Sequence, residues 1–128
     1  MQDWAWIESD AALAAHAEQL AEHGGADGIR DLGALESALA RPVNLAAYGS
    51  PDAAALAAAY AFGIARNHPF VDGNKRTAAV VSVAFLFVNS LEFSATPPEL
   101  TVAFLALAAG ELSEDEMANW FRQHMPPA

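Results

Sequence analysis

The chain has 128 residues, of which 54% are hydrophobic, and its sixteen acidic and six basic side chains give a net charge of −10. This apolar content excludes a disordered chain, and the length suits one domain with a buried core, so we expect a single domain over residues 1–128. The acidic balance argues against a direct nucleic-acid-binding protein, which normally presents a basic face.

The sequence also favours a soluble protein of the cytoplasm. It contains no cysteine, which fits a reducing compartment. Its first ten residues, MQDWAWIESD, lack the basic and apolar regions of a signal peptide. The longest apolar stretch, residues 78–88, is shorter than the ~20 residues that cross a bilayer, so we expect no membrane-spanning helix.

Helical signals begin close to the N-terminus. The first helix is predicted over residues 11–23, because Ser9 or Asp10 can cap its start. Gly24 and Gly25 follow this stretch and favour its end. A glycine-containing loop is expected to connect it to the next helix.

The second helix is predicted to be short. Residues 34–40 have a helical pattern that we expect to stop before Pro42, because proline lacks the N–H group that a helix interior needs. Residues 43–50 are then predicted to form a connector, either a small hairpin or a flap, that carries Tyr48.

A longer helix is predicted in the middle of the chain. Ser50 can cap its start, with Pro51 at the first helical position, where proline is favoured. Pro69 disfavours helical dihedral angles at His68, so we expect this helix to end by Asn67.

Three more predictions complete the secondary structure. The central helix is expected to start with Asp72 as its N-cap and to run to about Asn89. Residues 97–110 form a further helix, and a Ser113–Glu116 capping box starts the last one. Because no stretch alternates with period two, we predict an all-α fold around one buried central helix.

Three of the six basic residues, Arg66, Lys75 and Arg76, lie within eleven residues of one another. Lys75 and Arg76 fall in the expected first turn of the central helix, where the positive end of the helix dipole disfavours cations. A bound phosphate would relieve this conflict, because the free N–H groups of a helix N-terminus bind anions. The segment therefore predicts a phosphate site that also includes Gly73 and Asn74.

Two further residues suggest chemistry at this site. His68 lies on the preceding loop, and imidazole has the pKa range of a general base. Asp72 can hold Mg²⁺, which typically binds one or two carboxylates together with phosphate oxygens. Each residue alone is more often structural, as a hydrogen-bonded histidine or a helix cap. Their grouping in one cationic spot of an acidic chain favours phosphoryl or nucleotidyl transfer.

Residues 68–76, HPFVDGNKR, resemble the signature of the Fic fold family, H-P-F-x-x-G-N-G-R-x-x-R. Lys75 stands where that signature has Gly, and Ala79 stands where it has the final Arg. Both departures match the death-on-curing (Doc) branch, whose pattern is H-x-F-x-D-[AG]-N-K-R. Residues 23–42 and 85–93 also resemble the branch, so the similarity covers essentially the whole chain.

The resemblance implies a compact Fic-type helical fold and a toxin of a toxin–antitoxin pair. Doc-branch toxins are kinases that use ATP and Mg²⁺ to phosphorylate a threonine of elongation factor Tu, which stops translation. An antitoxin with a disordered tail that folds onto the toxin is the expected inhibitor. The acidic surface suits a partly basic segment of that antitoxin.

The same resemblance implies a role for each site residue. His68 deprotonates the acceptor hydroxyl, and Asp72 holds Mg²⁺. Tyr48 belongs to the flap that docks the target. His16 falls at a histidine position of the family, for which we expect a structural hydrogen bond between helices. The nucleotide phosphates are bound by Gly73, Asn74, Lys75 and Arg76, with Arg66 as a second-tier candidate.

Two other function classes stay open from the sequence. One is an AMP-transferase with a relaxed motif, which only the shared fold favours. The other is a non-catalytic binding module, against which the intact His68, Asp72 and Asn74 argue.

Overall fold

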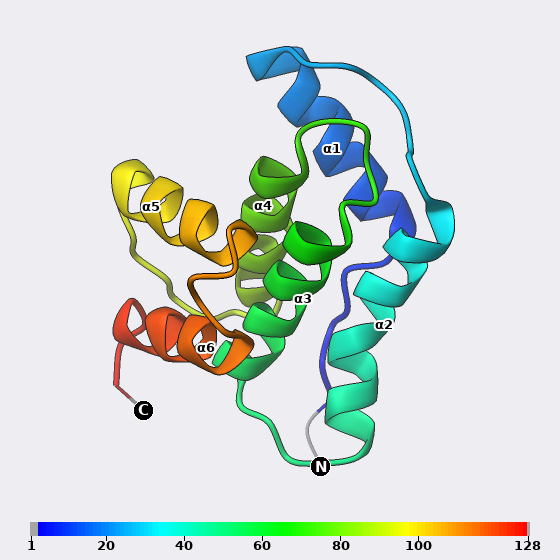
Figure 1. The fold of residues 1–128 in the computed structure, drawn as a ribbon. Helices are drawn as coiled ribbons and strands as arrows, with labels where there is room; N and C mark the ends of the chain where they lie inside the picture. Colours follow the sequence, from blue (N-terminus) through cyan, green and yellow to red (C-terminus); the bar gives the residue numbers. More distant parts are fainter. Residues whose placement is uncertain (1–2, 128) are drawn as a thin grey trace.

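The computed structural model describes residues 3–127 and is built from helices alone. Within this part of the chain the one β-type pairing is an isolated bridge between Ile29 and Phe70. The all-α prediction is confirmed (Figure 1). The six helices are α1 (Ser9–His23), α2 (Leu32–Ala47), α3 (Ala53–Asn67), α4 (Asn74–Val88), α5 (Pro97–Ala108) and α6 (Glu114–Gln123).

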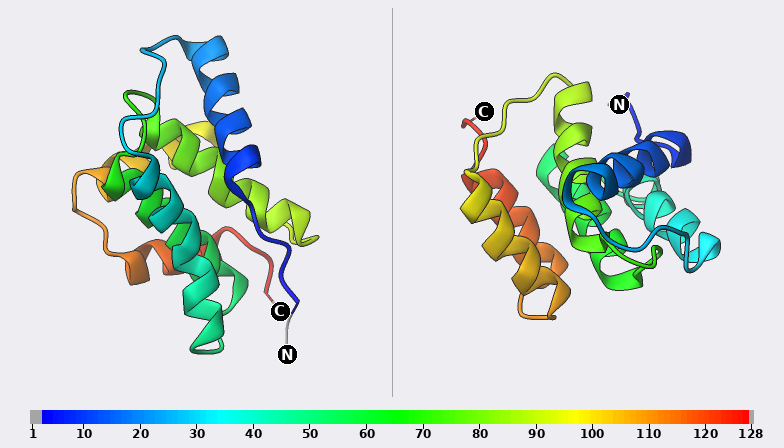
Figure 2. Two further views of the ribbon diagram at one scale, coloured as in Figure 1. Left: turned by 90° about the vertical axis from the view of Figure 1, so that its right-hand side faces the viewer. Right: turned by 90° about the horizontal axis from the view of Figure 1, so that it is seen from above.

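The centre of the fold is α3, and not the helix that the sequence indicated. Eleven of the fifteen residues of α3 are buried, against seven of fifteen in α4. Seen from above, α5 and α6 lie on one side of the α3–α4 pair, and α1 and α2 lie on the other (Figure 2). The prediction of α4 as the central helix is therefore wrong. The larger apolar side chains of α4 favoured the prediction that this helix is central, but Phe87 and Val88 are more than half exposed.

Alanine makes the central position of α3 possible, because small side chains let neighbouring helices approach closely. Most buried residues of α3 are alanine, and Tyr60 and Leu56 supply much of the remaining volume. Gly63 allows the closest approach: a Cβ atom there would lie 3.0 Å from the Cα atom of Ala38 in α2.

Helix α2 continues through Pro42 to Ala47, so the prediction of a short helix that stops before Pro42 is wrong. The connector predicted for residues 43–50 is mostly the last turn of this helix. The buried residues of α2, which are Leu35, Ala38, Leu39 and Pro42, keep a helical spacing that includes the proline itself. Burial on this face outweighs the loss of one backbone hydrogen bond at Pro42.

The other helix boundaries agree with the sequence to within about three residues. The end of α3 at Asn67 and the Ser113–Glu116 capping box of α6 are confirmed. Helix α3 starts later than expected, because Asp52 is its N-cap and accepts a hydrogen bond from Ala55 N. No helix in the described part of the chain is both long and apolar enough to cross a membrane.

The segment before α1 packs against the two inner helices, α3 and α4. Ile7 N donates to the buried Tyr60 hydroxyl at 2.8 Å, and burial raises the pKa of this tyrosine to about 12. Trp6 stacks on Phe85 of α4, and Asn89 exchanges two hydrogen bonds with the backbone of Ala5. This segment therefore closes the face between α3 and α4.

The contact at Gly63 gives a first testable prediction. Gly63→Ala normally favours a helix, but here the added methyl group would collide with the backbone of Ala38. We expect the free energy of unfolding to fall by about 1–3 kcal/mol, measured by urea denaturation. In the control Gly49→Ala, the new Cβ meets nothing nearer than 3.5 Å, so stability should hardly change. Equal or higher stability of Gly63→Ala would contradict this packing.

Candidate active site

The loop between α3 and α4 and the first turn of α4 surround a cavity of about 460 Å³. The structure thus brings together most of the residues that the sequence singled out. The cavity is lined by His68, Val71, Asp72, Gly73, Asn74, Lys75 and Arg76.

His68 ends α3 in a left-handed conformation, with φ of 49°, and its side chain is exposed. A residue other than glycine rarely adopts this conformation, so the surroundings must hold it there. Arg30 contributes to this: its Nε donates to the carbonyl of His68, and its Nη2 donates to that of Asn67 at 2.7 Å. A guanidinium group at the C-terminus of a helix also interacts favourably with the helix dipole. Arg30 therefore fixes the backbone that carries the histidine.

Residues 28–31 run beside the loop as a short extended strap. Arg30 N and Asp31 N both donate to the carbonyl of Pro69, at 2.8 and 3.0 Å, and Val71 N donates to Gly28 O at 3.1 Å. From the sequence, residues 28–31 were expected to lie in a connecting loop, within a block that resembles the Doc branch. Within residues 28–31, the glycine at position 28 is the feature of the sequence that could have indicated an unusual backbone. Its φ in the structure is 122°.

The Asn74 side chain closes the loop from inside. Its Oδ1 accepts from Phe70 N and its Nδ2 donates to Phe70 O, both at 2.9 Å. Asn74 is 9% exposed, and Phe70 is buried. In this structure the side chain therefore holds the loop, which is a different task from the predicted direct contact with phosphate.

Asp72 lies one residue earlier than its predicted place at the helix start. The N-cap of α4 is Gly73, with φ of 79°, and Asp72 accepts hydrogen bonds from Gly73 N at 2.8 Å and Ala26 N at 3.3 Å. These two backbone bonds, followed by the charge of Arg76, lower the pKa of the exposed Asp72 carboxyl group. The carboxylate is thus charged at neutral pH and is held at the mouth of the cavity.

His16 supports the same loop from α1. It is 4% exposed, its Nε2 lies 2.8 Å from the carbonyl oxygen of Asp72, and its ring stacks on Phe70 at 3.8 Å. A carbonyl oxygen accepts, so this nitrogen must carry the proton. The predicted structural hydrogen bond is confirmed, although it joins a helix to a loop.

The two cations lie at the N-terminus of α4, as the sequence predicted, and its first turn contains no acidic residue. Lys75 is exposed and makes no ion pair within residues 3–127. Arg76 donates to the carbonyl of Gly24 at 3.2 Å. Two positive side chains therefore meet uncapped helix N–H groups in one cavity, which is the arrangement of an anion site.

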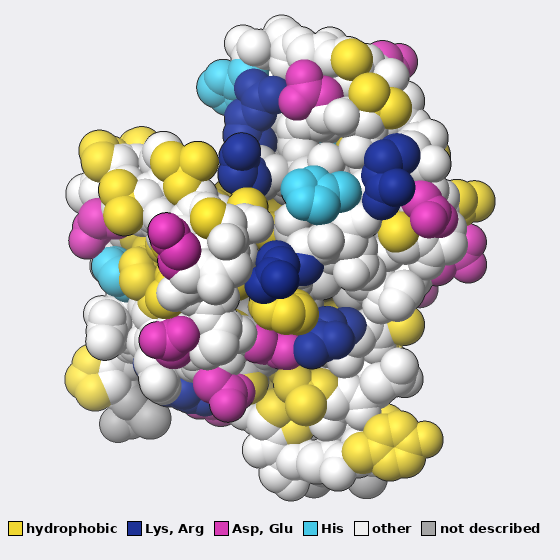
Figure 3. Space-filling view, in the orientation of Figure 1, with side chains coloured by type: hydrophobic (Ala, Val, Ile, Leu, Met, Phe, Trp, Pro, Cys, Tyr) yellow, Lys and Arg dark blue, Asp and Glu magenta, His cyan; other side chains and the backbone are white. Residues whose placement is uncertain are grey.

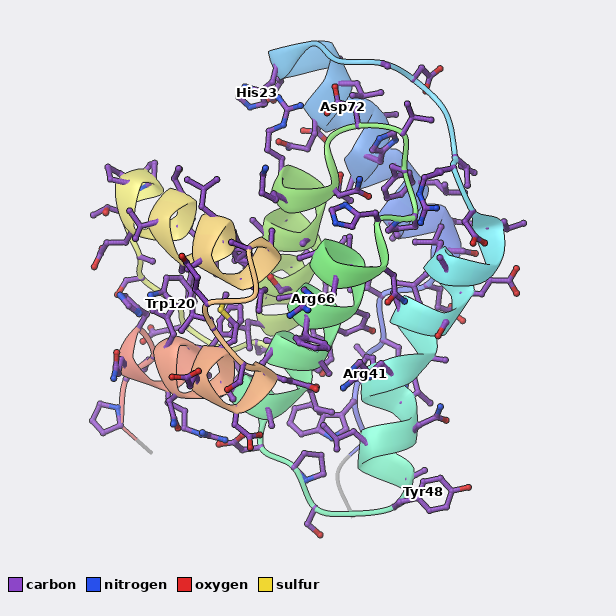
Figure 4. The ribbon with its side chains drawn as sticks, in the orientation of Figure 1. His23, Arg41, Tyr48, Arg66, Asp72 and Trp120 are labelled. Atoms are coloured by element: carbon purple, nitrogen blue, oxygen red, sulfur yellow. The ribbon has the colours of Figure 1, made fainter. Side chains whose placement is uncertain are left out.

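Two predicted residues lie outside this cavity. Arg66 is in the last turn of α3 but does not line it. Tyr48 ends α2 at the opposite side of the molecule from Asp72, and it is 91% exposed (Figure 4). Tyr48 therefore lies far from the cavity, and a role in docking the target stays a prediction. The segment that lies against the His68 loop is residues 28–31.

Asp72 is suited to Mg²⁺ only together with a ligand that brings its own oxygen atoms. Within the described residues, no group of three or more His, Cys, Asp or Glu side chains could hold a metal ion. Mg²⁺ in nucleotide sites commonly uses one or two carboxylates and takes its other ligands from phosphate and water. One ionised carboxylate beside an anion site fits that pattern.

Comparison with known proteins identifies one family to which the chain is similar. A sequence model of the Fic/DOC family matches residues 6–86. The chain is 31% identical over 118 residues to "Protein kinase doc" of Escherichia phage P1, covering 91% of this chain and 93% of that protein. It is 43% identical over 75 residues to "Toxin Doc" of Mycolicibacterium smegmatis (strain ATCC 700084 / mc(2)155), covering 56% of this chain and 57% of that protein.

The contacts of Arg30 give a second prediction. Arg30→Gln removes the charged donors at the end of α3, so the left-handed backbone at His68 should open more often. We expect amide hydrogen exchange of residues 70–73 to become roughly 10- to 150-fold faster, which corresponds to the ~1.5–3 kcal/mol of a hydrogen bond to a charged group. Mass spectrometry of the peptides measures this. Arg122→Gln, which breaks an exposed pair with Asp52, is the matched control. Unchanged exchange in Arg30→Gln would contradict the role of this arginine.

Proposed function

The chain belongs to the Fic/DOC family, and we propose that it is a toxin-type protein kinase that transfers the γ-phosphate of ATP to a threonine or serine hydroxyl. One observation carries the proposal: a single cavity joins an exposed histidine, an ionised aspartate and two cations at a helix N-terminus. Phosphoryl transfer needs little more from a protein than these positioned charges and a proton acceptor.

In this proposal, His68 is the general base. Its exposed ring stands at the rim of the cavity, where a hydroxyl group of another protein can reach it. The neutral imidazole accepts the hydroxyl proton while the oxygen forms a bond to the γ-phosphorus, and the bond from that phosphorus to the β–γ bridging oxygen breaks. The products are a phosphorylated protein and ADP.

Lys75, Arg76 and the first N–H groups of α4 bind the phosphates in this scheme. Gly73 has no side chain, and its left-handed backbone leaves the helix N-terminus open toward the cavity. Fixed donors that face the phosphate oxygens stabilise the charge that develops during transfer. The unfavourable position of the two cations thus becomes favourable once the anion is bound.

Asp72 would hold Mg²⁺ in the complex with ATP. The metal would neutralise phosphate charge when bound. The protein's own contribution is the position of the carboxylate, which Gly73 N and Ala26 N fix. Gly25 is needed for this, because a Cβ atom there would lie 2.7 Å from Asp72 Oδ2.

Kinase chemistry is preferred over AMP transfer for two reasons. A relative that covers nearly the whole chain is named a protein kinase. In addition, Ala79 stands where the AMP-transferring signature has arginine, and it lines an apolar hollow of about 160 Å³ together with Lys75, Arg76 and Phe104. An arginine at position 79 would fill this hollow with a further cation. The shared fold is the one argument for the alternative, a Fic-type AMP-transferase.

The target and the inhibitor follow from the same proposal. We take elongation factor Tu as the substrate, which places the activity in the cytoplasm and makes its result the arrest of translation. A relative is named "Toxin Doc". For this chain we propose a cognate antitoxin whose disordered tail folds onto the protein and closes the site.

Labelled ATP tests the proposal. Incubation with purified elongation factor Tu and Mg²⁺ should transfer label from the γ-position and not from the α-position. His68→Ala should lose at least about a hundredfold in rate, because a general base contributes typically 10²–10⁴-fold. Its melting temperature should stay unchanged. His23→Ala, which changes an exposed histidine at the end of α1, is the matched control and should keep full activity.

Three results would overturn parts of this scheme. Label transferred from the α-position would establish AMP transfer. Full activity of His68→Ala would exclude His68 as the base. Failure to bind Mg-ATP at all would favour a non-catalytic module that retains the fold.

A further inference from the structure

The basic side chains of this acidic protein are unevenly distributed. Figure 3 shows several Lys and Arg side chains gathered around an exposed histidine on one face of the molecule. The cavity accounts for Lys75 and Arg76. Figure 4 places Arg66 and Arg41 on the same face, farther from Asp72, where the proposed phosphate site gives them no task.

Arg41 and Arg66 share one aromatic ring. The guanidinium carbon of Arg41 lies 4.8 Å from the centre of the Phe62 ring, and that of Arg66 lies 5.3 Å from it. Such contacts hold a planar guanidinium group in place and leave its N–H groups available.

The two arginines differ in their charge balance. Arg41 forms an ion pair with Glu114, which raises the pKa of Arg41 by hydrogen bonding. Arg66 is exposed, and within residues 3–127 it has no acidic partner. It lies beside Gly110, whose added Cβ would meet its terminal nitrogens at 3.9 Å. Arg66 is therefore a positioned cation with an unused bidentate face.

Arg66 is also close in sequence to the proposed general base. It is in the last turn of α3, two residues before His68, yet it does not line the phosphate cavity. On the other side of Phe62, Arg41 borders a groove of about 600 Å³ that runs along α2 to the exposed Tyr48. A chain whose acceptor hydroxyl is at His68 would thus pass Arg66 and enter this groove.

We propose that Arg66 binds an acidic residue of the protein substrate close to the acceptor hydroxyl, and that the substrate chain continues over Arg41 into the α2 groove. This inference rests on the proposed kinase function and adds the substrate's sequence preference to it. A carboxylate matches the planar, bidentate face of a guanidinium group. In this arrangement Tyr48 contacts the substrate at a distance from His68, and not as part of a flap.

A protein chain fits this surface better than a nucleic acid. The groove beyond Phe62 contains one cation, Arg41, and the Glu114 carboxylate neutralises it. A phosphodiester backbone needs repeated positive charges along its path. A peptide needs one carboxylate near Arg66 and polar or apolar contacts afterwards, which the groove offers through Ser37, Asn44, Leu45 and Tyr48.

Peptide binding tests this inference without any catalysis. The probe is a fluorescein-labelled peptide with a central threonine and three adjacent aspartates, compared with the same peptide carrying asparagines. Fluorescence anisotropy at low salt should show that the acidic peptide binds more tightly, and that added salt weakens it. Arg66→Glu should reduce its affinity about tenfold, and Arg66→Lys should reduce it less. Arg122→Gln, a change of another exposed arginine, is the control.

Each contrary result has a distinct meaning. Equal affinity for the acidic and neutral peptides would overturn the inference. The inference would also be overturned if Arg66→Glu lost as much affinity for Mg-ATP as for the acidic peptide, because Arg66 would then bind phosphate. Stronger binding of a single-stranded RNA oligonucleotide at the same site would also overturn it. If the acidic peptide binds in a way that depends on Arg66, but no γ-phosphate is transferred to elongation factor Tu, the proposed kinase function is refuted and the peptide site is not.

Discussion

The left-handed backbone at His68 is the constraint on which the site depends. It turns the chain sharply out of α3, so that the histidine stays exposed while Pro69 and Phe70 enter the interior. This conformation is unfavourable for histidine by itself. Arg30 and the strap of residues 28–31 compensate through hydrogen bonds to three consecutive carbonyls, those of Asn67, His68 and Pro69. Helix termini, loop and strap therefore form one unit.

The interior of this unit explains why so few side chains face the cavity. The polar groups of Asn74 are hydrogen-bonded to the backbone of Phe70, and Nε2 of His16 is hydrogen-bonded to the carbonyl oxygen of Asp72. Phe70 packs between them, stacked on the imidazole ring. What remains for a ligand is His68 together with the charged groups of Asp72, Lys75 and Arg76. Burial separates the residues that build the loop from those that can meet a phosphate.

Charge organises the outer surface in the same way. With a net charge of −10, the chain repels most anions, and a local cluster of cations is needed to attract any anion. The helix N-terminus adds its own partial charge at the same place. Arg66 extends the positive face beyond the cavity, and the ring of Phe62 contacts both Arg66 and Arg41, whose charge Glu114 neutralises. In the proposed function, the cavity binds the nucleotide, and Arg66, which does not line this cavity, is left for the protein substrate.

The sequence by itself determined the local features: the all-α class, the end of α3 at Asn67, the capping box of α6 and the segment 68–76 that forms the cavity. These depend on caps, proline and short-range spacing, which act within a few residues. Only the tertiary structure decided that α2 passes Pro42, that α3 is central, that Asn74 faces Phe70 and that Arg66 lies outside the cavity. The reason is that burial and partner choice depend on residues distant in the sequence. Arg30 meets His68 only after folding brings α2 beside α3.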